Sequence, residues 1–350
     1  MRLSSLICAS RNALVTATVA LAGLFATSHQ AEAYTVTVLT SPGLYGGSGL
    51  WIGSNPNVVL GVTLTLGPIT QHAARWDFGV LTMLTEAVPG ANHSPRGIDS
   101  FGNIYGAVTP ATVSQPIKWV GGGTPIYLPV LAGATGGYID GVSPNGTAIG
   151  ASEGAPSGSK AVLWINNLPI ALTNPTGATA CAGAGVADNG FAAGVCSFGA
   201  VSRAVQWSAA GVPSVLPFLN GGSRSSARAV NAAGQVAGSG DSGGDPTKNN
   251  GIVWTLGVSK KLPKLNARTT IWEARGINAT GDAVGNANGG TRNGGTSHAA
   301  LWPKPYTTAI ELPTPGTHYN CYAYGISDTG VIVGNCGNPT GWQVPVRWDP

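Results

Sequence analysis

Tryptophan and the short apolar runs around it recur along the chain at a nearly constant spacing. Seven tryptophans stand at positions 76, 119, 164, 207, 254, 302 and 348, with similar gaps between them. Each ends a run such as KAVLW or HAALW, and a second short run such as PIALT or AIELP follows after a turn. Apolar runs of this length, bounded by Gly, Asn, Pro and Ser, predict short β-strands. A regular period of this kind indicates an array of similar structural units.

A glycine pattern precedes each of the last six of these Trp residues. It appears as GIDSFGNIYG, GVSPNGTAIG, GVADNGFAAG, AVNAAGQVAG, GINATGDAVG and GISDTGVIVG. The middle Gly follows turn-forming residues, as expected where positive φ closes a hairpin, and Asn57 replaces it in the first unit. The last Gly suits the close approach of a neighbouring backbone. With this hairpin, each unit has four predicted strands.

The ends of the chain indicate a closed ring. In most units a Leu of the fourth strand precedes the next unit's first position by one fixed distance, as from Leu84 to Gly97. The seventh unit stops after its Trp, yet Leu39 near the N-terminus precedes Ile52 of the first unit by that same distance. The sequence therefore predicts an all-β fold, a seven-bladed β-propeller with four antiparallel strands per blade, whose last blade is closed by the N-terminal strand.

Four cysteines fall within these units, and four cysteines allow three pairings. Cys181 and Cys196 have the same separation in sequence as Cys321 and Cys336, and each pair brackets the same hairpin of its unit. Residues placed in this way lie nearly opposite each other in a hairpin, within reach of a disulfide. We therefore predict the bonds Cys181–Cys196 and Cys321–Cys336, each contributing roughly 3 kcal/mol by the loop-entropy model.

The segment at 1–33 has the form of a secretory signal. Arg2 and Arg11 accompany an apolar core at 13–25, and Ala31-Glu32-Ala33 resembles a cleavage site. That core is too short to span a bilayer, so no membrane anchor is expected. We predict a signal peptide at 1–33, a single propeller domain at 34–350, and a secreted or periplasmic protein, in agreement with the disulfides.

Composition narrows the classes of partner. Charged residues make up only 9% of the chain, and its formal net charge of +4 includes the two Arg of the signal. Because no stripe of Lys and Arg is present, nucleic acid is not expected as a partner. Hydrophobic residues at 43% exclude a disordered chain. We expect a monomer without a cofactor.

The units resemble those of the HAF-repeat family of extracellular bacterial proteins. That family carries G-x-(S/N)-x-x-G-x-x-x-G followed by a His-Ala-aromatic-Leu-Trp run, and the segments at 72–76, HAARW, and 298–302, HAALW, are similar to it. Other units have Gln115, Lys160, Arg203, Asn250 and Val344 in place of the histidine, and no unit has Phe after the Ala. The resemblance implies an extracellular location and a propeller-like architecture, and it implies very little chemistry.

The string GDSGG at 240–244 matches the nucleophile segment of trypsin-like serine proteases. That chemistry needs a double barrel that brings a His and a buried Asp to the serine, and the repeats leave no residues for such a barrel. We interpret the segment as a solvated loop, in preference to a protease or to a calcium site at Asp241 and Asp245. No metal site is predicted, and His72 and His298 are interpreted as strand-end residues that form hydrogen bonds.

Residues that could bind a ligand or take part in catalysis lie just before the first small residue of several units. Arg96, Arg228 and Arg275 share one repeat position, which predicts three guanidinium groups at one mouth of the ring. A structural role, stacking or bonding to the next blade, is the alternative for each arginine. The predicted ligand-binding residues on this loop rim are Arg96, Tyr138, Asp140, Arg228, Trp272, Arg275, Tyr322 and Tyr324. The candidates for a catalytic role are Tyr324, Tyr138, His93 and Arg275.

Three functions fit this inventory. Arg together with Tyr and Trp suits a binding module for an extracellular polysaccharide or a surface protein. The same residues also suit a polysaccharide lyase, since β-elimination on a uronate needs Arg to neutralise charge and Tyr or His to move a proton. With only 14 acidic residues and no evident pair of them, hydrolysis by two carboxylates is disfavoured. A scaffold for protein contacts is the third hypothesis.

Overall fold

The computed structural model describes residues 34–350, apart from 42–45, 54, 68, 155–157, 244 and 290–295. These residues belong to one compact unit, Ala31–Pro350. The predicted signal peptide, 1–33, lies outside the described residues. Within the described part of the chain no helix has the length and apolar character needed to cross a membrane.

Seven antiparallel sheets of four strands each make up the fold, and we number the blades in chain order. Blade 1 contains β2 (Gly47–Ile52), β3 (Val58–Thr65), β4 (Thr70–Asp77) and β5 (Val80–Met83). Blade 2 contains β6 (Asn92–Ile98), β7 (Ile104–Thr109), β8 (Gln115–Trp119) and β9 (Pro125–Tyr127), with a 3-10 turn, η1 (Val120–Gly122), before β9. Blade 3 contains β10 (Gly136–Val142), β11 (Ala148–Glu153), β12 (Lys160–Ile165) and β13 (Leu168–Ala171).

The remaining four blades repeat this order. Blade 4 contains β14 (Ala180–Val186), β15 (Ala192–Phe198), β16 (Val201–Trp207) and β17 (Pro213–Val215). Blade 5 contains β18 (Ser225–Val230), β19 (Val236–Ser242), β20 (Asp245–Thr255) and β21 (Val258–Lys261). Blade 6 contains β22 (Thr269–Ile277), β23 (Ala283–Gly289), β24 (Thr296–Trp302) and β25 (Ile310–Glu311). Blade 7 contains β26 (Tyr319–Ile326), β27 (Ile332–Gly337), β28 (Gln343–Asp349) and β1 (Thr35–Val38).

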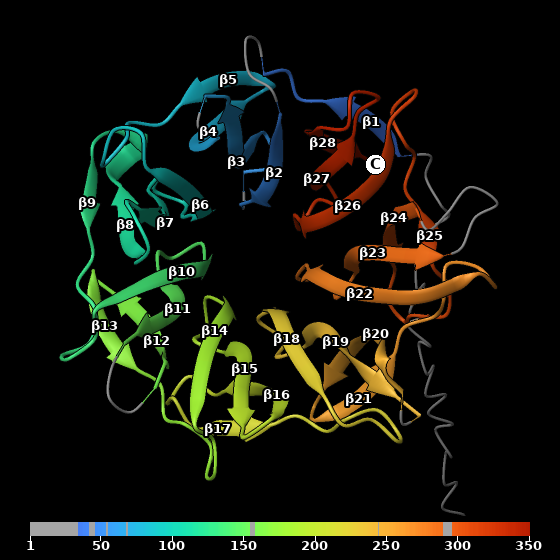
Figure 1. Cartoon of the computed structure of the whole chain (residues 1–350). Coiled ribbons are helices and arrows are strands. Elements are labelled where there is room, and N and C mark those ends of the chain that lie inside the picture. The colour runs from blue at the N-terminus through green and yellow to red at the C-terminus, as the bar shows by residue number, and fades with distance from the viewer. Residues whose placement is uncertain are drawn as a thin grey trace, which may run out of the picture. The chain divides into compact units, whose positions relative to one another are not determined.

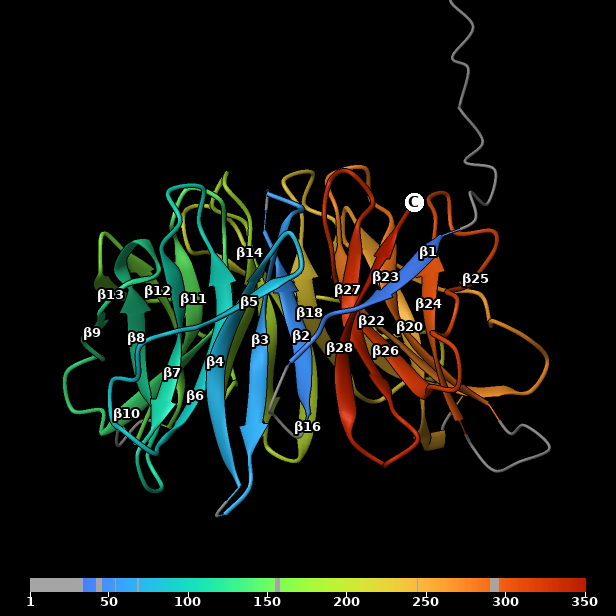
Figure 2. The ribbon, with the colours of Figure 1, turned by 90° about the horizontal axis from the view of Figure 1, so that it is seen from above.

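The seven sheets stand around a central axis, with the first strand of each blade innermost (Figure 1). This confirms the predicted seven-bladed β-propeller. Seen from the edge, β1 runs beside β28 (Figure 2), where Thr35 pairs with Asp349 and Val38 with Val346. The N-terminal strand therefore supplies the outer strand of the last blade, as predicted.

The repeat tryptophans join each blade to the one before it. All seven are buried, and each indole Nε1–H donates to the carbonyl that follows the preceding blade's outer strand, at 2.7 to 2.9 Å. The acceptor for Trp76 of blade 1 is the carbonyl of Thr40, which follows β1. The same bond that links neighbouring blades thus also closes the ring.

The glycine pattern has the two predicted roles. The middle Gly of the six hairpins takes a positive φ, for example 81° at Gly102 and 95° at Gly281. The last Gly lies against the inner strand of its own blade, where a Cβ on Gly150 would meet the carbonyl oxygen of Tyr138 at 1.9 Å. A side chain at this position would push the first two strands of the blade apart.

Every inner strand contains a β-bulge at the same place. The register shifts by one residue at Gly49/Trp51, Pro95/Gly97, Ile139/Gly141, Gly183/Gly185, Ala227/Ala229, Ala274/Gly276 and Ala323/Gly325. The extra residue is Arg96 in blade 2, Asp140 in blade 3, Arg228 in blade 5 and Arg275 in blade 6. A bulge leaves one residue unpaired and changes the direction of its side chain, so these residues owe their placement to the bulges.

Both predicted disulfides are present. Cys181 pairs with Cys196 across β14 and β15, and Cys321 with Cys336 across β26 and β27, with Cα atoms 4.1 Å apart in each. Each bond therefore joins the two innermost strands of its blade, in blades 4 and 7.

Candidate functional site

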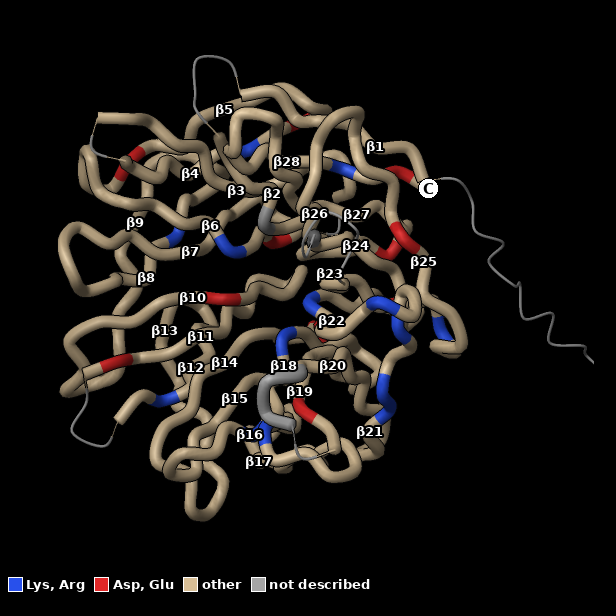
Figure 3. The backbone as a smooth tube through the Cα atoms, turned by 45° about the vertical axis from the view of Figure 1, so that its right-hand side comes forward, with Lys and Arg blue, Asp and Glu red and all other residues tan. Residues whose placement is uncertain are grey.

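The predicted ligand-binding residues lie on the inner strands, beside the central axis, rather than on a loop rim. Figure 3 shows basic positions on β6 and β18 and an acidic position on β10 around this axis. Along each strand, buried residues alternate with partly exposed ones, and most of the predicted residues belong to the exposed set. Side chains in a strand alternate between two faces, so this set shares one face of each inner strand.

Arg96 forms an ion pair with Asp140, and Arg228 acts on the same carboxylate without contacting it. The Nε atom of Arg96 lies 3.7 Å from Oδ1 of Asp140, and both side chains remain more than a third exposed. Burial raises the pKa of Asp140, while Arg96 and Arg228 act to lower it. The guanidinium groups of blades 2 and 5 therefore both lie near a carboxylate of blade 3. Blade 4 has Ala184 at the equivalent bulge, so no large side chain separates Asp140 from Arg228.

Arg275 has a fuller set of partners than the other two arginines. It forms an ion pair with Glu273, donates from Nε to Oδ1 of Asn286 at 3.0 Å, and lies 5.1 Å from the ring centre of Tyr324. The Tyr324 ring is in turn stacked with Tyr322, with 6.5 Å between centres. These contacts hold Arg275 in place. They fit the structural role, stacking and bonding within the protein, that is the alternative to ligand binding for each of the three arginines. By contrast, the structure shows no hydrogen bond or ion pair for the Arg228 side chain among the described residues.

The two candidate tyrosines are poor proton acceptors. Burial raises the pKa of Tyr138 to about 12, with a further contribution from Asp140. Burial also raises the pKa of Tyr324, against the opposing effect of Arg275. A phenol with a raised pKa stays protonated at neutral pH, so it donates a hydrogen bond and does not act as a general base.

His93 and Trp272 lie apart from this group. His93 is fully buried, where its Nε2 accepts from the Ala87 N–H and its Nδ1 bonds the Ala91 carbonyl, both at 2.9 Å. Trp272 is 2% exposed, donates to the Leu262 carbonyl, and packs in the core of blades 5 and 6. Both side chains face the blade interior, so neither is placed to contact a ligand at the axis.

A polar pocket of about 350 Å³ lies where β18 begins. It is lined by Ser202, Arg224, Ser225, Ser226, Arg228, Ser239, Gly240, Asn249 and Ile271. We call it the polar pocket. Of its residues, only Arg228 belongs to the predicted ligand-binding set, although Arg224 lies in the same stretch of sequence; the serines carry no distinguishing pattern in a chain so rich in Ser and Gly. The pocket combines two arginines, Arg224 and Arg228, with several serines, a set that suits a hydroxylated anion.

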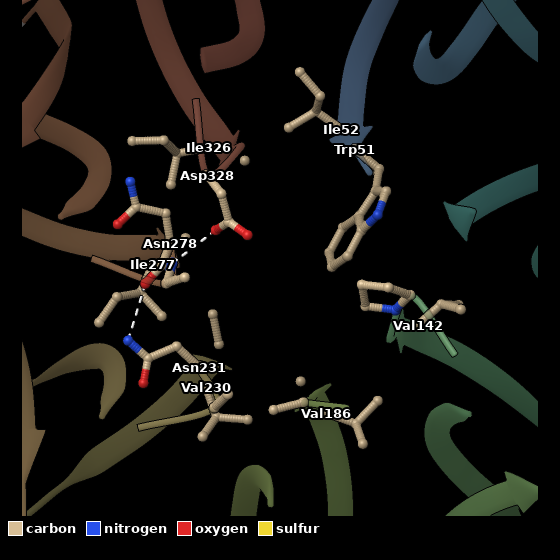
Figure 4. Close-up of a pocket in the computed structure, with 18 of the residues that line it drawn as sticks. Trp51, Ile52, Val142, Val186, Val230, Asn231, Ile277, Asn278, Ile326 and Asp328 are labelled. Atoms are coloured by element: carbon tan, nitrogen blue, oxygen red, sulfur yellow. Dashed lines mark hydrogen bonds between the residues drawn. The ribbon is translucent and has the colours of Figure 1, made fainter. Parts of the chain in front are cut away.

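A second pocket, of about 200 Å³, lies at the opposite end of the inner strands (Figure 4). Its wall consists of the aliphatic residue that follows the bulge in six blades, together with the indole of Trp51. These aliphatic residues are Ile52, Val142, Val186, Val230, Ile277 and Ile326. We call it the apolar pocket. Arg275 and Tyr324 also contribute to its lining.

The hairpins around the apolar pocket are bonded from blade to blade. Asp188 of blade 4 accepts from the Asn145 N–H of blade 3, and Asp328 of blade 7 accepts from the Ala279 N–H of blade 6, both at 2.8 Å. Asn231 donates to the Asn278 carbonyl at 2.9 Å, another bond between blades (Figure 4). Because these bonds fix the hairpins relative to one another, the pocket is preformed.

Gly240, Asp241 and Ser242 of the GDSGG segment belong to β19, which corrects the interpretation of this segment as a solvated loop. Asp241 is 1% exposed, and its carboxylate accepts from the backbone N–H and the hydroxyl of Ser223 and from the Arg224 N–H. Burial raises the pKa of Asp241, but these hydrogen bonds outweigh it and the net shift is downward. Through these hydrogen bonds, the Asp241 carboxylate holds the loop that precedes β18 against β19. Gly244 and the side chain of Asp245 lie outside the described residues.

Within the described ranges, no three His, Cys, Asp or Glu residues are grouped so that they would hold a metal ion. His72 contacts Oε1 of Glu86 at 2.6 Å and Oγ1 of Thr65 at 2.9 Å. His298 contacts Oε1 of Glu311 at 2.6 Å. Both histidines therefore form hydrogen bonds at the ends of their strands, as interpreted from the sequence.

Several solved structures are similar to this chain in fold. A virginiamycin B lyase from Staphylococcus aureus is 13% identical over 91% of this chain and 99% of its own, with a TM-score of 0.56. The β-propeller domain of the Trilobed protease from Pyrococcus furiosus is 10% identical over 89% of this chain and 95% of its own, with a TM-score of 0.60. An acylaminoacyl peptidase from Pyrococcus horikoshii is 12% identical over 84% of this chain and 49% of its own, with a TM-score of 0.55.

No protein-family model and no curated protein sequence matches the chain. At identities this low the structural likeness shows the fold alone, since one fold carries many functions. The resemblance to the HAF repeats accordingly stays a prediction from the sequence.

Proposed function

We propose that this protein is an exported β-propeller that binds an anionic extracellular saccharide in the polar pocket. The observation that carries the proposal is Arg228, whose guanidinium lines a pocket of hydroxyls and has no bonded partner in the described part of the chain. Arg forks bind carboxylate and sulfate groups in two parallel hydrogen bonds, and serine hydroxyls suit the hydroxyls of a sugar. A pocket of about 350 Å³ falls in the usual range for small-molecule sites.

The arrangement supports binding over β-elimination. Tyr138 and Tyr324 are held protonated by burial, and both nitrogens of His93 are engaged with the backbone. Elimination needs a base that removes the proton beside the uronate carboxyl group, and none of the three candidates is suited to that role. The disulfides support the exported location, since such bonds form in oxidising compartments.

Isothermal titration calorimetry with a galacturonate trimer and a neutral galactose trimer tests the proposal. We expect the uronate to bind more tightly, and Arg228→Gln to weaken its binding about tenfold or more, since a charge-assisted pair is lost. Arg75→Gln is the matched control, because Arg75 forms its ion pair with Asp77 within β4 of blade 1, away from the polar pocket. Equal affinity for both trimers, or an unchanged affinity in Arg228→Gln, would contradict the proposal.

Ultraviolet absorbance of the same mixtures distinguishes the lyase. Rising absorbance from unsaturated products, lost in Tyr324→Phe, would favour elimination over binding alone. Absence of both binding and turnover with uronate and sulfated oligosaccharides would favour the scaffold hypothesis.

A further inference from the structure

Trp51 is an exception within the repeat. Its register partner in β3 is Leu60, which places it at the same position as Gly97, Gly141, Gly185, Ala229, Gly276 and Gly325 of the other blades. Those blades need a small residue there, since a Cβ on Gly97 would lie 2.6 Å from the Val142 side chain. Blade 1 instead places an indole at this position, and its ring points into the apolar pocket (Figure 4).

The size of the apolar pocket fits one ring-sized group. An apolar protein cavity of about 150 Å³ is large enough for benzene, and this pocket is about 200 Å³. Val and Ile from six blades contribute to its wall, so an apolar group gains contact with several blades at once. The indole of Trp51 adds a flat surface for stacking.

The mouth of the pocket is acidic. Asp188 and Asp328 both line it and are exposed, and each uses Oδ1 to accept a backbone N–H from the neighbouring hairpin. The structure shows no bond to Oδ2 of either residue within the described part of the chain. Among the described residues of the lining, Arg275 is the only basic one, and Glu273 and Asn286 already engage it.

We propose that the apolar pocket binds a small organic cation, with its apolar ring against Trp51 and its ammonium group at the carboxylate of Asp328, while Asp188, three blades away around the ring, adds to the negative potential. The carboxylates attract the ammonium group, and the face of an indole attracts a cation as well. This site is independent of the polar pocket, lies at the other end of the inner strands, and prefers the opposite charge.

Three probes that share a phenyl ring and a two-carbon linker test the preference by calorimetry at low salt. They are phenethylammonium, 2-phenylethanol and 3-phenylpropionate. We expect affinity to fall in that order, with the cation favoured over the alcohol by about fivefold, as one exposed charge contact and the potential of a second carboxylate allow. No binding of any probe, or binding of the anion as tight as that of the cation, would overturn the proposal.

Variants separate the two parts of the pocket. Trp51→Ala introduces a residue that blade 5 already carries at this position, as Ala229, and we expect it to weaken the cation and the alcohol alike, while Trp51→Phe retains binding. The double variant Asp188→Asn, Asp328→Asn keeps both Oδ1 acceptors, and we expect it to abolish only the advantage of the cation. Unchanged affinity in Trp51→Ala, or an undiminished advantage of the cation in the double variant, would refute the site.

The matched control is Arg228→Gln, a residue of the polar pocket that does not line the apolar one. We expect it to leave the binding of all three probes unchanged. Loss of phenethylammonium binding in this variant would place the cation elsewhere and overturn the proposal. Failure of the saccharide experiment leaves this test intact, because the two sites are probed with different ligands and Arg228→Gln serves here only as a control.

Discussion

At the scale of the residue, the side chains that build the blades and those that face the axis alternate along the same strands. Tyr138 and Asp140 are two positions apart and share a face, as do Glu273 and Arg275. His93 precedes Arg96 by three positions, and Trp272 precedes Arg275 by three, so each belongs to the opposite, buried face. Buried polar groups need partners, and the backbone supplies them to His93 and Trp272.

The burial of His93 gives the protein a dependence on pH. Burial lowers the pKa of His93, so the folded protein keeps this ring neutral while the unfolded chain takes up a proton near its ordinary value, about pH 6.5. The unfolded state then binds more protons below that pH, and stability falls as the pH falls through this window. We expect the free energy of unfolding to decrease between about pH 7.5 and 5, and to decrease less in His93→Gln.

Denaturant unfolding at several pH values measures both proteins. The difference between the two curves isolates His93 from the other titrating groups. Curves that run parallel would show that His93 is protonated equally in both states, contrary to the buried neutral ring.

At the scale of the element, the two disulfides join the innermost strands of blades 4 and 7. Each closes a loop with a sequence separation of 15, for which the entropy model gives about 3 kcal/mol. We expect Cys181→Ala, Cys196→Ala to lower the free energy of unfolding by about this amount, and Cys321→Ala, Cys336→Ala to do the same. Because the two blades are not adjacent, the losses should add in the fourfold variant.

Chemical denaturation of the three variants, with the wild-type protein under reducing conditions as a reference, provides the measurement. A reduced wild-type protein that is as stable as the oxidised one would refute this account. A fourfold variant whose loss falls well short of the sum would show that the blades are coupled.

The blades were predictable from the sequence because each repeated residue type meets one local structural need. The repeat Trp fills the space between blades, the middle Gly provides positive φ, and the cysteines face each other across a hairpin. The site was only partly predictable. The shared position of the three arginines follows from the repeat, but the bulges that direct them do not. Strand alternation would have separated His93 and Trp272 from the other candidates.

Trp51 escaped prediction for a different reason. The hairpin of blade 1 runs from Ile52 to its partner Val59, one residue longer than the Ile98 to Ile104 hairpin of blade 2. Aligning unit one by its last glycine therefore matched Ile52, instead of Trp51, to the small residue of the other units. A single inserted residue in the turn shifted the alignment by one position. Trp51, the aromatic residue that stands where the other blades have Gly or Ala, was therefore missed at the sequence level.

At the scale of the whole molecule, closure of the ring depends on the N-terminal strand. Leu39 is 4% exposed and its N–H donates to the Pro345 carbonyl, while Leu128 of blade 2 is 3% exposed and donates to Pro116 in the same manner. If β1 is an integral strand of blade 7, the two leucines are equivalent. We therefore expect Leu39→Ala and Leu128→Ala to lower the free energy of unfolding by similar amounts, each about 2 to 5 kcal/mol.

Equilibrium unfolding followed by tryptophan fluorescence and by far-ultraviolet circular dichroism tests this equivalence. We expect the two probes to give coincident transitions in both variants, because bonds such as that from the Trp76 indole to the Thr40 carbonyl couple each blade to the next. A Leu39→Ala variant as stable as the wild type, beside a destabilised Leu128→Ala, would mean that the ring holds without its N-terminal strand. The preformed pockets at the axis would then rest on six contacts between blades instead of seven.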